Sequence, residues 1–130
     1  MTTLTLTIRG SSLPSWNEIM RMHHHGQHSV QQSWMWCVVG AIDPDSPRFD
    51  TPVAICVTSY QAGRLIDPDN LYVKGVIDGI KSRLFPDDSP KWVDSVLLRS
   101  RKDKANPRVE IEISELAAPA VELERKAVGG

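Results

Sequence analysis

The sequence predicts an α+β fold in which two helices pack on a small mixed sheet, in the order β-α-β-α-β-β. Segments near both ends alternate apolar and polar residues with the period of a half-buried strand, and two longer segments carry apolar residues at helical spacing. The chain has 130 residues, which suits one domain of the usual roughly 100–200 residues. We therefore expect a single domain over residues 1–115 and a flexible C-terminal tail over residues 116–130.

The first strand and the first helix are predicted in the N-terminal third. In TLTLTIR the leucines and the isoleucine alternate with polar residues, which is typical of a strand with one buried face. Residues 10–28 are rich in turn formers and predict a loop with one helical turn over residues 16–22. A helix then runs from Ser29 to about Gly40. Its apolar positions are Val30, Trp34, Cys37, Val38 and Ala41.

The middle of the chain predicts an interior strand and a second helix. VAICVTSY, residues 53–60, is apolar on both faces and rich in β-branched residues, as interior strands are. Asp69 suits an N-cap, so the helix is expected to begin near Asn70 and to end near Lys81. Its apolar stripe consists of Val73, Val76, Ile77, Ile80 and Leu84. The two glycines inside it each cost about 1 kcal/mol of helix propensity, and we expect close backbone contact to compensate.

Two more strands are predicted in KWVDSVLL and RVEIEIS, and we expect them to pair as a hairpin. The segment from Arg99 to Arg108 carries five basic residues against one acidic residue. Such a cluster can bind phosphate groups. A solvated hairpin tip is the simpler interpretation.

Composition excludes several classes of protein. Apolar residues make up 41% and charged residues 24% of the chain, with a formal net charge of −1, which is typical of a globular domain. The longest near-apolar run, Trp34 to Ile42, is about half of the ~20 residues that cross a bilayer. The N-terminus lacks the pattern of a secretion signal, so we expect a cytoplasmic protein with no membrane partner. Cys37 and Cys56 stand apart among apolar neighbours and predict buried, inert thiols.

Two acidic pairs flank the second predicted helix. Asp67 and Asp69 belong to DPDN, which is by itself good turn chemistry. Asp87 and Asp88 follow the helix in FPDDSP. If the helix ends by about Ser82 and the chain runs back along it, one of the later pair reaches the earlier pair.

Three carboxylates at one helix start would repel one another unless a hard cation such as Mg²⁺ joins them. We expect Asp67, Asp69 and Asp88 to be the metal ligands, with Mn²⁺ as the alternative ion. Asp87 is the alternative to Asp88, because adjacent residues of an extended chain point to opposite sides.

A carboxylate-bound magnesium ion near basic residues predicts phosphodiester hydrolysis. Lys74, in the following helix, is expected to stabilise developing charge or to orient the attacking water. Candidate catalytic residues are therefore Asp67, Asp69 and Lys74, together with Asp88 or its alternative Asp87. The sequence has no glycine-rich nucleotide motif and no recognisable Ser/His/Asp arrangement.

Four segments, LPSWNEI, DPDNLYVKGVIDGI, FPDDSPKWV and RVEIEI, resemble the RusA family of Holliday-junction resolvases, which is common in bacteria and their phages. The resemblance spans Leu4 to Ile113. It implies a RusA-like fold and a homodimeric Mg²⁺-dependent endonuclease that cuts four-way junctions symmetrically in recombination, repair or phage replication. It also implies that the three aspartates bind Mg²⁺ and that Lys74 is needed for cleavage. Lys74 departs from the family pattern by one residue, which turns it by about 100° around the helix.

Branched DNA is the expected partner. Its expected contacts are Asn17, Asn70, Arg99, Arg101, Lys102 and Lys104. Two other functions stay open: a non-catalytic branched nucleic-acid-binding module in which the carboxylates are structural, and a phosphohydrolase or a nuclease of the Pro-Asp…(Asp/Glu)-x-Lys type. The last is weakened because Asp88 and Lys91 are one residue too far apart.

MHHHGQH, residues 22–28, contains four histidines. Histidines at this density can bind a transition metal. Because they have no partner residues at a recognised metal-site spacing, a flexible loop is the simpler interpretation.

Overall fold

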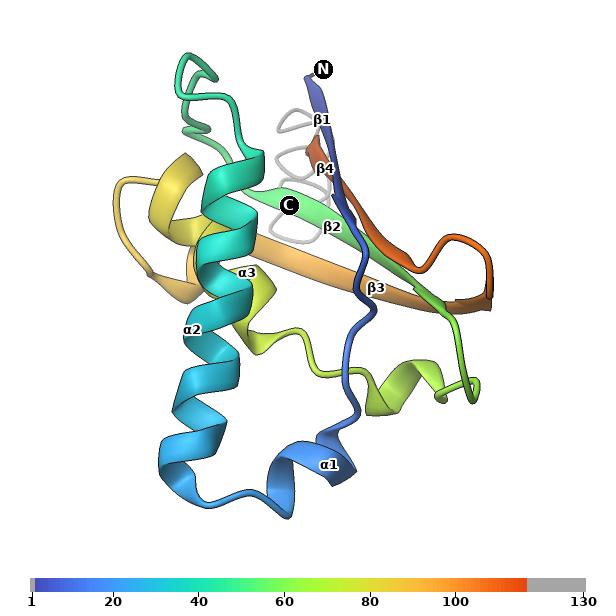
Figure 1. The fold of residues 1–130 in the computed structure, drawn as a ribbon. Helices are drawn as coiled ribbons and strands as arrows, with labels where there is room; N and C mark the ends of the chain where they lie inside the picture. The colour runs from blue at the N-terminus through green and yellow to red at the C-terminus, as the bar shows by residue number, and fades with distance from the viewer. Residues whose placement is uncertain (1, 117–130) are drawn as a thin grey trace, which may run out of the picture.

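The computed structural model describes residues 2–116, so nearly all of the predicted tail lies outside the described residues. A four-stranded mixed sheet is covered on one face by helices (Figure 1). This confirms the α+β class and the predicted order of the strands and of the two long helices. The strands are β1 (Thr3–Arg9), β2 (Val53–Gln61), β3 (Val93–Lys102) and β4 (Arg108–Glu115). The helices are α1 (Trp16–Met20), α2 (His24–Ala41) and α3 (Lys74–Leu84), and the 3-10 turns are η1 (Pro68–Asn70) and η2 (Pro90–Trp92).

The sheet has the strand order β1-β4-β2-β3, which makes β2 interior as predicted. β4 pairs antiparallel with both β1 and β2, while β3 pairs parallel with β2. The predicted hairpin of the last two strands is therefore wrong, because β2 lies between them. The connection over residues 103–107 crosses one strand, a span of about 10 Å. The more apolar β2 takes the interior place, and β3, which carries Asp94, takes an edge.

The core lies between the sheet and the two long helices. Along β2, every second residue is buried and the residues between are half-buried. Val109, Ile111 and Ile113 of β4 are fully buried in register with them. α2 and α3 cover this face (Figure 1), and none of the helices within residues 2–116 lies over the opposite face of the sheet.

α2 and α3 pack with close backbone contact, as the glycines predict. A Cβ atom on Gly75 would overlap the backbone carbonyl of Gln31, and one on Gly79 would lie 2.8 Å from that of Met35. Only glycine fits at such positions, so the propensity cost is offset by close helix packing.

The second long helix begins later and ends later than predicted. Val73 is the N-cap of α3, so the prediction of Asp69 as N-cap is wrong. The reason is tertiary: Leu71 forms a β-bridge with Ser15, and the Tyr72 N–H donates to the Pro14 carbonyl at 2.9 Å. These bonds hold the chain extended between η1 and α3.

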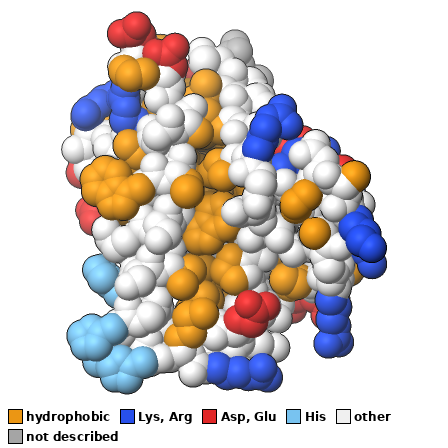
Figure 2. Space-filling model, in the orientation of Figure 1, with side chains coloured by type: hydrophobic (Ala, Val, Ile, Leu, Met, Phe, Trp, Pro, Cys, Tyr) orange, Lys and Arg blue, Asp and Glu red, His pale blue; other side chains and the backbone are white. Residues whose placement is uncertain are grey.

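The histidine-rich segment is helical, so the prediction of a loop there is wrong. His23 is the N-cap of α2, and its Nδ1 accepts a hydrogen bond from the His25 N–H at 3.3 Å. Figure 2 shows the histidine side chains gathered at one end of the molecule and exposed to solvent. The predicted helical turn near Trp16 is confirmed as α1, which Ser15 caps.

The two cysteines differ in burial. Cys56 is half-buried on β2, but Cys37 is exposed on α2, which contradicts the prediction of two buried thiols. Val38, the next residue, takes the buried position of this turn. None of the helices in residues 2–116 is long and apolar enough to cross a membrane.

Candidate active site

A cleft of about 690 Å³ lies between the segment that contains α1 and the segment that follows β2. It brings together three residues predicted from the sequence, Asn17, Asp67 and Asn70, although Asn17 is about 50 positions from the others. The remaining lining residues are Ser12, Leu13, Pro14, Ser15, Glu18, Arg21, Gln61, Gly63, Arg64, Leu65 and Ile66. Two distant stretches of chain therefore form its walls.

A buried polar pair on β2 holds these walls together. Ser59 Oγ accepts a hydrogen bond from the Leu13 N–H at 2.9 Å. Gln61 Nε2 donates to Ser59 Oγ at 2.7 Å and to the Leu13 carbonyl at 3.3 Å. Ser59 is 0% and Gln61 4% exposed, so these bonds are shielded from water. Breaking one would leave a buried polar group unsatisfied.

α1 presents polar side chains to the cleft. Ser15 Oγ accepts from the Glu18 N–H at 3.1 Å, which caps α1, and donates to Glu18 Oε1 at 3.3 Å. The Trp16 ring packs edge-on against Tyr72, with centroids 4.7 Å apart. These contacts leave Asn17 and Arg21 at the cleft.

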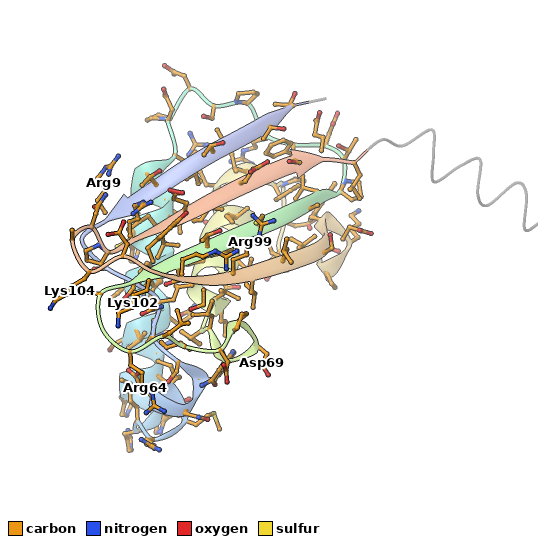
Figure 3. All side chains as sticks on the ribbon, turned by 90° about the vertical axis from the view of Figure 1, so that its right-hand side faces the viewer. Arg9, Arg64, Asp69, Arg99, Lys102 and Lys104 are labelled. Atoms are coloured by element: carbon orange, nitrogen blue, oxygen red, sulfur yellow. The ribbon has the colours of Figure 1, made fainter. Side chains whose placement is uncertain are left out.

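The DPDN segment forms η1 in one wall of the cleft. The Asn70 N–H donates to the Asp67 carbonyl at 2.9 Å, which closes the turn. Asp67 and Asp69 are both exposed, and the Asp67 side chain makes no capping hydrogen bond in the turn. Figure 3 shows Asp69 in this turn and Arg64 in the same connection between β2 and α3. Open carboxylates two residues apart, with an amide beside them, are ligands that suit Mg²⁺.

Asp88 lies far from this turn within one chain. α3 spans 11 residues, about 16 Å at 1.5 Å per residue, and Figure 1 shows η1 and the segment after α3 at opposite ends of the helix. The carboxylates of Asp67, Asp69 and Asp88 do not gather within 4.8 Å of one another. The predicted return of the chain to the helix start is therefore wrong for a single chain.

Aromatic packing explains why the chain does not return. Phe85, the residue after α3, is 2% exposed and stacks between Phe49 and Trp92, with centroids 5.8 and 5.3 Å away. Pro86 then prevents further helix. The chain is thus held at the far end of α3, where it enters η2 and β3.

Asp87 and Asp88 differ in their hydrogen bonds. Asp87 Oδ1 accepts from the Ser89 N–H at 2.9 Å and from the Trp92 indole N–H at 2.7 Å. These two bonds lower the pKa of the Asp87 carboxyl, and the bond from Ser89 has the larger effect. Asp88 is exposed, and its backbone carbonyl accepts a long hydrogen bond from Lys81 Nζ at 3.5 Å. This arrangement favours Asp88 over Asp87 as a metal ligand.

Lys74 does not line the cleft. It is the first residue of α3, and its Nζ lies 3.6 Å from Asp78 Oδ2. The same oxygen of Asp78 accepts a hydrogen bond from Gln31 of α2 at 2.7 Å. The lysine is thus exposed and loosely paired on the α2 side of the helix.

Four of the five clustered basic residues are exposed: Arg99, Arg101, Lys102 and Lys104. Arg108 has a structural role instead, because it pairs with Asp103 at 2.8 Å and with Glu110 at 3.2 Å. Its guanidinium also lies 3.7 Å from the centroid of the Tyr60 ring. The hydrogen bond with Arg108 lowers the pKa of Asp103.

Three further basic residues, Arg9, Arg21 and Arg64, were not predicted as site residues from the sequence. Register places Arg9, Arg108, Tyr60 and Arg101 in one row across the uncovered face of the sheet. Figure 3 shows Arg9, Lys102 and Lys104 toward the same end of the sheet. Arg21 and Arg64 line the cleft. Isolated arginines carry no sequence signal, but the polar Ser59 and Gln61 could have been noticed, because they occupy the buried phase of an otherwise apolar strand.

Comparison with known proteins identifies a family for this chain. Residues 50–114, half of the chain, match the family model described as endodeoxyribonuclease RusA. The matched part contains β2, η1, α3, β3 and nearly all of β4, and with them all four predicted catalytic residues. No curated protein matches the chain. The match over half of the chain shows that this protein belongs to the RusA family of endodeoxyribonucleases.

Proposed function

We propose that this protein is a Mg²⁺-dependent endonuclease that resolves Holliday junctions and related branched DNA by paired phosphodiester hydrolysis, in recombination, repair or phage replication. One observation carries the proposal: Asp67 and Asn70 in the acidic turn of a RusA-family chain line a cleft, and the carboxylates of Asp67 and of Asp69, which lies beside the cleft lining in this turn, are exposed to solvent. Membership of the family supports the DNA substrate, and the chemistry of the cleft supports the metal.

Asp67 and Asp69 are proposed to hold the ion together with Asp88. Carboxylate oxygens are the ligands that Mg²⁺ prefers, and Mn²⁺ is the alternative. When bound, such an ion polarises the scissile phosphate and lowers the pKa of its bound water. Without it, the two exposed carboxylates would repel a DNA phosphate.

The other side chains of the cleft suit DNA. Arg21 and Arg64 place two positive charges among its lining residues, and guanidinium groups bind phosphate through paired hydrogen bonds. Asn17 and Asn70 offer amides from opposite walls. We propose that these residues position the strand and that Lys74 stabilises charge at the phosphate. The proposed role of Lys74 rests on the family pattern, because its ammonium contacts Asp78 in this conformation.

A homodimer is proposed because one chain leaves the site incomplete. β3 is an edge strand with Val96 and Leu97 exposed, 40% and 51%, near its centre. An uncovered apolar edge of this kind favours pairing with another strand. If two copies paired their β3 edges antiparallel, the start of one β3 would lie beside the end of the other.

Such pairing would also complete the proposed metal site. Asp88 immediately precedes η2 and β3, whereas η1 packs against β3. Figure 1 shows η1 on the side of the domain toward which β3 runs. Asp88 of the partner subunit would then approach Asp67 and Asp69, and a two-fold dimer would carry two sites for the two cuts.

The test is incubation of the protein with a synthetic four-way junction and with linear duplex of the same sequence, with and without Mg²⁺. We expect paired symmetric nicks in the junction alone, and only with the metal. Asp69→Asn should lower the cleavage rate on the order of a hundredfold or more, while junction binding stays intact or becomes stronger because a repulsive charge is removed. Junction binding without any product would instead indicate a non-catalytic binding module.

A further inference from the structure

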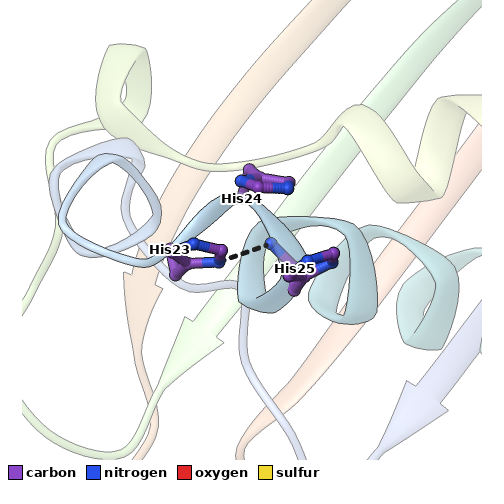
Figure 4. A group of neighbouring side chains, drawn as sticks. All are labelled: His23, His24 and His25. Carbon is purple, nitrogen blue, oxygen red and sulfur yellow. Dashed lines mark hydrogen bonds between the residues drawn. The ribbon is translucent and has the colours of Figure 1, made fainter.

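Three histidine side chains meet at the start of α2, outside the cleft. His23 is the N-cap of the helix, and His24 and His25 are its first two residues. All three are exposed, and one ring nitrogen from each lies within 4.8 Å of the other two. The ring centroids are 4.1 to 5.0 Å apart (Figure 4). Within residues 2–116, this is the one group of three or more His, Cys, Asp or Glu residues that is so close.

The donor set indicates the class of ion. Imidazole nitrogens bind Zn²⁺, Ni²⁺ and Cu²⁺ well, whereas Mg²⁺ prefers oxygen. A zinc ion with nitrogen ligands at about 2.0–2.1 Å needs those nitrogens roughly 3.4 Å apart. The present spacing needs only a modest closing movement, and exposed side chains can turn to make it.

We propose that His23, His24 and His25 form a binding site for a zinc-class transition-metal ion, distinct from the carboxylates of the cleft. Three protein nitrogens leave a fourth position open to water or to another ligand. Figure 2 shows the histidine side chains projecting into solvent, so the ion has free access. The inference does not depend on the proposed function.

Binding would change the start of α2. His23 Nδ1 accepts the hydrogen bond that caps the helix, so a neutral His23 carries its proton on Nε2. If Nδ1 binds the metal, or if the proton moves to it and Nε2 binds, that cap bond is lost. The bound metal would then link His23 to the first turn of α2 in place of this hydrogen bond. Arg21, two residues before His23 in the sequence, lines the cleft.

The experiment is a zinc titration of the full chain in excess Mg²⁺, read by competition with a chromophoric chelator. Magnesium occupies oxygen sites and leaves imidazoles free. We expect the wild type to bind one Zn²⁺ per chain. The double variant H24A/H25A, which keeps the His23 cap, should bind on the order of tenfold more weakly or worse. Wild type without zinc binding, or a double variant with unchanged affinity, would overturn the proposal.

Two control variants separate the three histidines from other ligands. His28→Ala removes an exposed histidine of the same helix that is outside the group, and Cys37→Ser removes the exposed thiol. Both should bind zinc as the wild type does. Loss of binding in Cys37→Ser with retention in H24A/H25A would assign the ion to the thiol and contradict the proposal.

Thermal unfolding gives a readout independent of the chelator. An ion that binds only the folded chain raises the melting temperature, and the increase grows with the logarithm of its concentration divided by its dissociation constant. Zinc should raise the melting temperature of the wild type and of His28→Ala, and leave that of H24A/H25A unchanged. The replaced side chains are exposed, so the metal-free melting temperature of H24A/H25A should match the wild type and show that the variant is folded.

Discussion

Asp69 precedes α3 and Asp88 follows it, so the helix separates two carboxylates that are proposed to bind the same ion. The aromatic stack around Phe85 holds the second of them at the far end. We therefore propose that the site takes Asp69 from one copy of the chain and Asp88 from another.

Mixed dimers test this sharing. Asp69→Asn and Asp88→Asn should each be inactive alone. A heterodimer of the two, purified through separate tags, would keep one intact site if Asp88 acts across the dimer. It should therefore nick one strand of a junction, as gel analysis with single-strand labels would show.

A reciprocal heterodimer is the control. A wild-type chain paired with a chain that carries both substitutions keeps an intact site only if Asp88 acts within its own chain. We expect this pair to be inactive. Activity in this pair, with none in the first, would place all three carboxylates in one chain and contradict the shared site.

Alanine substitutions of Asp87 and Asp88 should have different effects: one on stability and the other on cleavage. Asp88→Ala should reduce junction cleavage on the order of a hundredfold and leave the melting temperature unchanged. Asp87→Ala removes the acceptor for Ser89 and Trp92, so it should lower the melting temperature while most cleavage remains. If instead Asp87→Ala abolished cleavage in a folded protein, Asp87 would be the ligand.

The contribution of Asp87 also depends on pH. Its pKa is lowered in the folded protein, so the carboxylate form stabilises the fold above the ordinary carboxyl pKa. This stabilisation is lost as the pH falls through the lowered pKa. The difference in melting temperature between wild type and Asp87→Ala should therefore narrow in acid.

Gln61 should matter for stability and for the shape of the cleft. Gln61→Ala removes two buried hydrogen bonds and should lower the free energy of unfolding by about 1–3 kcal/mol in urea. Because the Leu13 segment loses an anchor, junction cleavage should fall as well. Gln32→Ala on α2 is the control, and about 0.5 kcal/mol or less is expected there. Equal effects of the two substitutions would show that the buried pair is not an anchor.

The salt dependence of junction binding tests the basic residues. If Arg101 and Lys104 contact phosphates, Arg101→Ala and Lys104→Ala should each reduce the slope of log K against log salt by about 1. Neither should change the melting temperature, since both side chains are exposed. Arg108→Ala should instead lower the melting temperature and leave the slope unchanged, because the ion pairs of Arg108 and its contact with Tyr60 are within the chain. Unchanged slopes would exclude this surface from DNA binding.

The sequence by itself determined most of the elements and the turn that contains Asp67 and Asp69. Alternation in β1 and β4 and the apolar stripe of α3 are local periodicities, so they could be read without knowledge of the fold. The glycines of α3 likewise predicted its close approach to α2, because no other residue fits there. The DPDN turn stood out because its residue types carry ligands and turn geometry together.

Only the tertiary structure decided where these parts meet. Strand order depends on which strand gains most from two neighbours, so the apolar β2 separates β3 from β4 although they are adjacent in sequence. The start of α3 was decided by bonds to Pro14 and Ser15, which compete with local helix capping. The position of Asp88 was decided by the burial of Phe85 among distant aromatic rings. Each of these outcomes depends on contacts between residues far apart in the chain, which a local pattern does not encode.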